Sequence, residues 1–362
     1  MPSPKLFAPG PVDVSKETFA AMSQTMIGHR GKDFEELYAS TQPGLQEIFG
    51  TARPVFLATC SAWGVMEGAL LNLAKKKVLC LCCGAFSDKW LDVAKKCGFE
   101  AEAVQAEWGH AIDPEAVRAK LAEGGFDTVT FIHSETSTGV LNDIVGISQV
   151  VKSFPDTMLI VDCVSSLSTV PVNMDANHID VMLAGVQKAL ALPPGLAVFA
   201  VSEAAMERAK GKANRGYYLD FIEFAKNAAV NNTPSTPAIS IIYGLQHILR
   251  EIAKEGFAAR QVRHATTNAM IAAWGARHGF ERFAPEGRRS FALTCFKTPV
   301  DFDLAGFIKN LKTQHHFLIN GGYGKIKGST FRISNMGNET VATIQELITA
   351  MDDVLSAGGT TP

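Results

Sequence analysis

Two side chains in the middle of the chain could perform chemistry together: Lys188 and Asp162. Lys188 follows the apolar run Val181–Ala184, at a point where the chain leaves a predicted strand and turns back. A lysine in a partly dry pocket loses part of its preference for the charged form, so its amine can attack a carbonyl and form a Schiff base. Asp162 ends the run Met158–Val161, which predicts a buried parallel strand. A carboxylate at the end of one strand and an amine beyond the next lie together at the ligand-binding edge of an α/β sheet.

This pair of groups suits pyridoxal phosphate (PLP). The cofactor needs a lysine for its aldehyde and an acid that keeps its ring nitrogen protonated. A surface lysine that caps a loop is the alternative interpretation of Lys188 alone.

The order of predicted elements favours an α/β fold with a mostly parallel sheet covered by helices on both faces. Strand-like runs alternate with helical patterns up to about residue 256. From residue 257 a long helical pattern, two strands and two further helices predict a smaller α+β domain. We therefore expect an N-terminal arm over residues 1–14, a large cofactor-binding domain over 15–256 and a small domain over 257–362.

The composition favours an ordinary soluble enzyme. Hydrophobic residues make up 47% and charged residues 19% of the 362 residues, and the net charge is −2. This balance gives no electrostatic reason to expect nucleic acid or membrane binding. No apolar stretch reaches the length of a membrane span and the first residues do not read as a signal peptide, so we expect a cytoplasmic protein. The cysteines lack metal-site spacing, and no metal is expected.

Three further positions could hold a cofactor or substrate. Ser61 lies between a strand and a helix, where free N–H groups can bind a phosphate, although it could simply cap the helix. Phe86 follows the next strand and could stack on a pyridine ring or be an ordinary core residue. Arg332 stands between apolar residues of a strand, and it could bind a substrate carboxylate or form an internal salt bridge. The segment His133–Gly139 offers hydroxyls at the same sheet edge or is a plain polar turn.

Several ordered motifs resemble the class V aminotransferases, specifically the alanine–glyoxylate and serine–pyruvate group of fold type I PLP enzymes. The resemblance extends over nearly the whole chain, and its motifs are Phe7–Pro11, Ile27–Arg30, Glu135–Gly139, Val161–Leu167, Gln187–Leu190 with Pro193–Gly195, and Arg332. It implies a large domain with a mostly parallel seven-stranded sheet and a smaller C-terminal α+β domain.

The resemblance also implies a role for each matching residue. Lys188 would form the Schiff base and Asp162 would contact the ring nitrogen, while Phe86 and Val164 would cover the two ring faces. Arg332 would bind the substrate α-carboxylate. The other implied cofactor contacts are Ser61, Ala62, Trp63 and Gln187 at the phosphate, Ser137 near the phenolic oxygen, and Thr236 from a partner subunit.

The implied activity is a ping-pong transfer of an amino group between alanine or serine and glyoxylate or pyruvate, in a homodimer with active sites at the subunit interface. Ser235 stands where the family commonly has tyrosine, and a serine cannot reach as far towards the phosphate of the partner subunit. Thr236 can still donate a hydrogen bond to it. Phosphoserine or aspartate are alternative substrates. A PLP-dependent lyase or desulfurase, a nicotinamide-dependent dehydrogenase and a catalytically silent scaffold are further alternatives.

Overall fold

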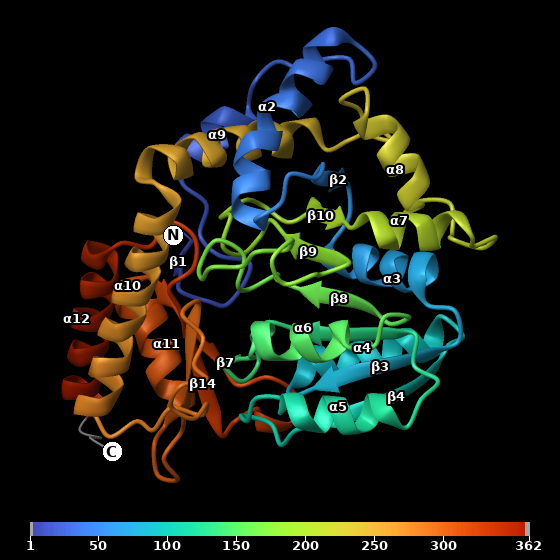
Figure 1. Ribbon diagram of the computed structural model, residues 1–362. Coiled ribbons are helices and arrows are strands. Elements are labelled where there is room, and N and C mark those ends of the chain that lie inside the picture. The colour runs from blue at the N-terminus through green and yellow to red at the C-terminus, as the bar shows by residue number, and fades with distance from the viewer. Residues whose placement is uncertain (1–2, 359–362) are drawn as a thin grey trace.

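The computed structural model describes residues 3–358 as a seven-stranded sheet flanked by helices and a smaller unit built mostly from C-terminal elements (Figure 1). The strands of the large sheet lie in the order β2-β10-β9-β8-β5-β3-β4. Their bounds are β2 Phe56–Ala58, β3 Lys77–Cys82, β4 Glu100–Gln105, β5 Thr128–Ile132, β8 Met158–Asp162, β9 Val181–Gly185 and β10 Ala197–Val201.

The four neighbouring strands β3, β5, β8 and β9 form the parallel centre of this sheet, and β4 joins β3 in the same direction. Every residue of β5, β8 and β9 is buried. Strands covered on both faces need side chains that tolerate burial on both sides, which explains their continuous apolar runs. Among these seven strands, β10 alone is reversed: it pairs antiparallel with β9 on one side and with the edge strand β2 on the other, so β2 runs in the direction of the parallel centre.

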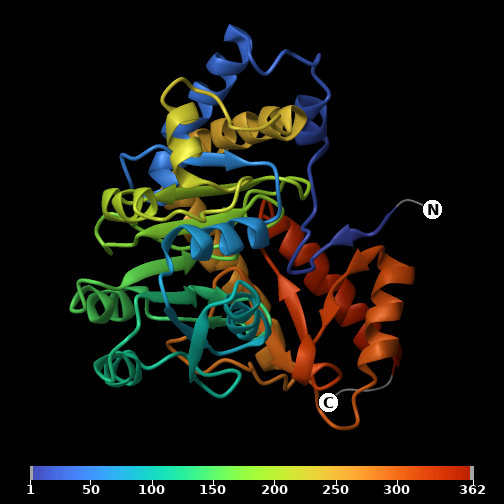
Figure 2. The ribbon, with the colours of Figure 1, turned by 90° about the vertical axis from the view of Figure 1, so that its right-hand side faces the viewer.

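Helices cover both faces of this sheet (Figures 1 and 2). Their bounds are α1 Lys16–Met22, α2 Lys32–Phe49, α3 Ala62–Leu73, α4 Ala85–Lys96, α5 Pro114–Ala122, α6 Ile144–Lys152, α7 Glu203–Lys210, α8 Phe221–Ala228 and α9 Ile239–Glu255. A short hairpin, β6 Ser134–Glu135 with β7 Val140–Leu141, follows β5.

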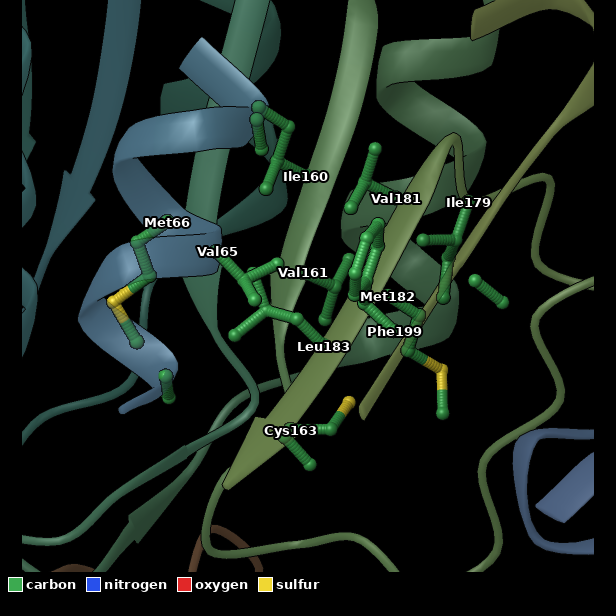
Figure 3. Packing of buried hydrophobic residues seen from close by; sticks show 14 of the residues in the cluster. Val65, Met66, Ile160, Val161, Cys163, Ile179, Val181, Met182, Leu183 and Phe199 are labelled. Carbon is green, nitrogen blue, oxygen red and sulfur yellow. The ribbon is translucent and has the colours of Figure 1, made fainter. Parts of the chain in front are cut away.

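The main core lies between the sheet and these helices. Figure 3 shows Val65 of α3 facing side chains of β8 and β9, among them Val161 and Leu183. Val65, Val161 and Leu183 are completely buried. Burial of each such side chain stabilises the fold by about 1.5–3 kcal/mol, so the two strands that lead to Asp162 and Lys188 are held rigidly.

The C-terminal elements enclose a second core. They are α10 Phe257–Arg277, β11 Leu293–Lys297, α11 Leu304–His315, β12 Phe317–Leu318, β13 Asn320–Gly321, a 3-10 turn Gly324–Ile326, β14 Thr330–Ser334 and α12 Val341–Gly358. Trp274, Phe296 and Phe331 pack in this core, with ring centroids 6.1 Å apart for the first two and 5.3 Å for the last two. The strand order here is β11-β14-β13, and all pairs are antiparallel.

The N-terminal segment joins the second core rather than the first. Strand β1, Lys5–Leu6, pairs in parallel with β12, and Phe7 is completely buried in the second core. Figure 2 shows this segment in blue beside the orange and red C-terminal elements.

The predicted fold class is confirmed, including the mostly parallel seven-stranded sheet. The division into residues 1–14, 15–256 and 257–362 stays a prediction, and residues 1–2 and 359–362 lie outside the described part. None of the helices within residues 3–358 is both long and apolar enough to cross a membrane.

Candidate active site

Adjacent parallel strands bring Asp162 and Lys188 to the same sheet edge. Asp162 is the last residue of β8 and lies in register with Leu183 of β9. Lys188 follows three residues after the end of β9. Both are buried, with 3% and 9% of their surface exposed. The structure thus places a buried amine and a buried carboxylate at one sheet edge.

The Lys188 amine is held by two hydroxyl groups. Its Nζ donates to Thr136 Oγ1 at 2.9 Å and to Ser165 Oγ at 3.0 Å. Gly10 covers the lysine stem closely, since a Cβ added there would lie 3.1 Å from Lys188 Cε. Burial lowers the pKa of Lys188 to about 8, although the nearby carboxylates oppose this shift. At pH 7 about one tenth of the amine is therefore uncharged.

The Asp162 carboxyl group is the complementary acid. Its Oδ1 accepts a hydrogen bond from Val164 N at 2.8 Å. Burial raises its pKa to about 7, and that hydrogen bond and the Lys188 cation oppose the rise. Within residues 3–358 the two groups do not form an ion pair with each other. Each therefore retains bonding capacity for a molecule placed between them.

A cavity of about 90 Å³ opens around this pair. It is lined by Ser61, Ala62, Trp63, Met66, Phe86, Ile132, Ser134, Thr136, Asp162, Val164, Ser165, Gln187 and Lys188. All of the predicted site residues except Arg332, Ser137 and Thr236 line this cavity.

One end of the cavity is the N-terminus of α3. Ser61 occupies the position before the helix, and its hydroxyl makes no capping hydrogen bond. Ala62 and Trp63 are the first two helical residues, whose N–H groups have no partner within the helix. A phosphate is stabilised by such N–H groups and by the helix dipole. This end of the cavity is suited to a phosphate.

An aromatic ring forms one wall of the cavity. Phe86 lies in the first turn of α4, and its ring centroid is 5.5 Å from Lys188 Nζ. The ring also stacks against Tyr323, with centroids 5.2 Å apart and planes 10° from parallel. Tyr323 comes from the C-terminal part of the chain, so a distant segment packs against the ring that forms this wall.

The polar segment after β5 presents Thr136 rather than Ser137 to the cavity. Ser134 and Thr136 both line it, as expected for alternate residues of an extended strand. Ser137 instead donates its hydroxyl to Glu135 Oε1 at 2.6 Å and accepts from Ala85 N at 2.9 Å. Its predicted contact with the cofactor stays a prediction that this geometry does not support.

Thr136 and Ser165 are site residues that we did not single out in the sequence. Both lie in motifs that carried the family resemblance, so the correct segments were available. A period of two counted from Ser134 points to Thr136. The contact of Ser165 with Lys188 depends on the turn after β8 and leaves no comparable pattern.

Arg332 lies in β14, and its buried side chain donates to carbonyl oxygens. Its Nε and Nη2 donate to Gly321 O at 3.2 and 3.1 Å, and its Nη1 donates to Thr136 O at 3.4 Å. Burial lowers the pKa of Arg332. No acidic side chain within residues 3–358 forms a salt bridge with it, so the internal salt bridge that we weighed is absent from the described part. The charge is available for an anionic ligand.

Thr236 lies apart from this cavity. It is exposed in the loop before α9, next to Pro237, and does not line the cavity of its own chain. Ser235 lines a separate small pocket with Thr59 and Tyr218. The predicted contact of Thr236 with a phosphate requires a second subunit and stays a prediction.

The donor set fits PLP. A phosphate-binding helix end, an aromatic wall, a buried acid and a buried amine surround one cavity, which is the set of groups this cofactor requires. Together, fold and site define a PLP-dependent enzyme with a doubly covered parallel sheet.

The comparisons with known proteins agree. Residues 14–307 match the family Aminotransferase class-V, and the chain belongs to this family. It is 37% identical to an uncharacterized aminotransferase of Methanocaldococcus jannaschii, over 94% of this chain and 90% of that one. It is 31% identical to a serine–glyoxylate aminotransferase of Methylorubrum extorquens, over 92% of this chain and 86% of the relative.

The fold is also similar to that of a solved alanine–glyoxylate aminotransferase from Nostoc sp., with a TM-score of 0.93, 27% identity, and coverage of 98% of this chain and 96% of the other. The predicted family, the predicted enzyme class and the predicted cofactor are confirmed: the protein is a PLP-dependent aminotransferase.

Proposed function

We propose that the protein transfers an amino group between a small amino acid, alanine or serine, and glyoxylate or pyruvate. The observation that carries this proposal is the Arg332 cation, which is buried beside the Lys188 cavity and, within residues 3–358, donates hydrogen bonds only to carbonyl oxygens. One carboxylate of a substrate would complete its coordination as a bidentate pair. A substrate with a single carboxylate, such as alanine or serine, needs no second cationic side chain.

When bound, PLP supplies an electron-accepting ring for carbanion stabilisation. Asp162 would hold a proton at the ring nitrogen, since its carboxyl group is the buried acid of the cavity. The N–H groups of Ala62 and Trp63, with the hydroxyl of Ser61 and the amide of Gln187, would bind the phosphate. Phe86 and Val164 would cover the two ring faces and exclude water.

Lys188 would serve as both the covalent anchor and the base. With a pKa lowered to about 8, Nζ can accept the substrate α-proton and return it without a large energetic cost. The hydroxyls of Thr136 and Ser165 orient this atom. Thr136 also connects the two ends of the substrate site, because its carbonyl accepts from Arg332 while its hydroxyl accepts from Lys188.

The names of two similar proteins support the choice of substrates, because one acts on serine and glyoxylate and the other on alanine and glyoxylate. We include in the proposal a cytoplasmic homodimer in which Thr236 of one subunit approaches the phosphate of the other. Thr236 is exposed and does not line the cavity of its own chain, which is compatible with this role.

The test is a single half-reaction followed by visible absorbance. The purified PLP-loaded protein is mixed with one amino acid at a time, and the change of the cofactor band is recorded. Alanine or serine should change the band rapidly. A response to phosphoserine or aspartate but not to alanine or serine would refute the proposed substrates while leaving the aminotransferase class intact.

A further inference from the structure

Glu135 is a buried carboxylate to which the proposed chemistry gives no role. It lies at the end of β6 with none of its surface exposed. Ser134 and Thr136, its neighbours along the chain, line the cavity, whereas Glu135 points to the opposite side. Burying a charge is costly unless it is well bonded, so a carboxylate at this place requires an explanation.

The carboxylate binds the first turn of α4. Its Oε2 accepts from Ser87 N at 2.9 Å, and its Oε1 accepts from Phe86 N at 3.4 Å and from Ser137 N at 3.0 Å. These are N–H groups at a helix start and the adjacent turn, where an anion is stabilised by the dipole. Gly84 makes room for it, since a Cβ there would lie 2.4 Å from Glu135 Cγ. The helix that carries Phe86 is therefore fixed through Glu135.

The same carboxylate is a charge beside the reacting groups. Within residues 3–358 no lysine or arginine forms an ion pair with it. Its negative charge acts to raise the pKa of Lys188, Asp162, Arg332 and the Cys83 thiol. The buried charges around the Lys188 amine are thus two carboxylates, Asp162 and Glu135, and the Arg332 cation.

We propose that Glu135 is a positioning residue with two linked effects: it fixes the turn that carries Phe86, and its negative charge favours the protonated form of the Lys188 amine. The inference rests on the PLP-dependent function proposed above and extends it. Proton transfer at Nζ requires an amine that can hold a proton for part of the cycle. Because Asp162 would pair with the ring nitrogen of the cofactor, Glu135 is the other buried carboxylate whose charge can stabilise the protonated amine.

The experiment measures how fast the cofactor-free protein captures PLP as a function of pH. Only the neutral amine reacts, so the rate rises with pH and its midpoint reports the pKa of Lys188. Glu135→Gln removes the charge and keeps the shape. We expect its midpoint to fall by about one pH unit, since loss of a nearby anion disfavours the ammonium form. The exposed Glu107→Gln serves as the matched control and should leave the midpoint unchanged.

The possible outcomes separate the two proposals. If the unmodified protein does not capture PLP, the proposed function fails. If it does, and folded Glu135→Gln keeps the unmodified midpoint, only the role of Glu135 is overturned. Should Glu135→Gln fail to fold, Glu135→Asp decides the question, because it retains the charge on a shorter side chain. That variant should keep the midpoint and bind PLP more weakly, and a midpoint displaced by more than about half a pH unit would overturn the proposal.

Discussion

Removal of one of the two hydroxyl groups that accept hydrogen bonds from the Lys188 amine should make the cofactor-free protein react faster with PLP near neutral pH. Thr136→Val keeps the shape of the side chain but deletes the acceptor that lies 2.9 Å from Nζ. A hydrogen bond to a charged group contributes about 1.5–3 kcal/mol. Because Ser165 still accepts from Nζ at 3.0 Å, we take the lower value.

The magnitude follows from the linkage between energy and pKa. A loss of about 1.5 kcal/mol lowers the pKa by about one unit, since one unit corresponds to about 1.4 kcal/mol. The pKa of Lys188 then falls from about 8 to about 7. At pH 7 the neutral share of the amine rises from about one tenth to about one half, a roughly fivefold gain in capture rate.

Stopped-flow absorbance at a series of pH values would measure this midpoint. Thr138→Val is the matched control, because the buried Thr138 hydroxyl has no hydrogen-bond partner in the described part of the chain. It should leave the midpoint in place. A midpoint in Thr136→Val that stays the same or moves upward would refute the claim that this hydroxyl stabilises the ammonium form.

Three further perturbations test other parts of the site. The pKa of Asp162 is about 4 in the unfolded chain and about 7 in the folded chain, so the folded cofactor-free protein binds more protons between these values and its stability should fall as pH rises through this window. Asp162→Asn should weaken that fall in a series of thermal melts. An equally steep loss of stability in the variant would contradict the assignment. Arg332→Gln should raise the KM for the amino acid by about two orders of magnitude, as expected when one partner of a buried charge pair is removed, with PLP binding unchanged; a variant that loses PLP but keeps its KM would show that Arg332 serves the cofactor. Ser61→Ala should weaken PLP binding about fivefold through loss of one hydrogen bond, measured by equilibrium titration, whereas unchanged affinity would place the phosphate elsewhere.

The central part of the site was predictable because it depends on strand patterning. Apolar runs such as Met158–Val161 and Val181–Ala184 are continuous since both faces of the sheet are covered, and polar residues that follow such runs must lie at the sheet edge. Asp162 and Lys188 were found in this way. The N-terminus of α3 was found similarly, from the position of Ser61 between a strand and a helix.

Other features depend on contacts between distant segments. The apolar run of β10 reads like its parallel neighbours, and nothing in it encodes that it runs antiparallel. Strand β4 is polar because it lies at the sheet edge, so it carries no apolar run. Tyr323 reaches Phe86 from a loop more than two hundred residues later in the chain, and sequence spacing gives no indication of that stacking.

The sequence alone does not fix which hydroxyl of the segment after β5 faces the cavity. The segment Ser134–Gly139 contains several hydroxyl groups, and their orientation is set by β6, which is only two residues long. Glu135 binds N–H groups in the first turn of α4 and does not line the cavity. Side-chain direction in so short a strand is decided by these neighbours.

The most direct test of the account is to find where PLP attaches. The PLP-loaded protein is reduced with borohydride, digested, and analysed by mass spectrometry for the modified peptide. We expect the cofactor to be fixed to Lys188 and Lys188→Ala to carry none. A cofactor fixed to a different lysine, or a protein that binds none after reconstitution, would contradict it.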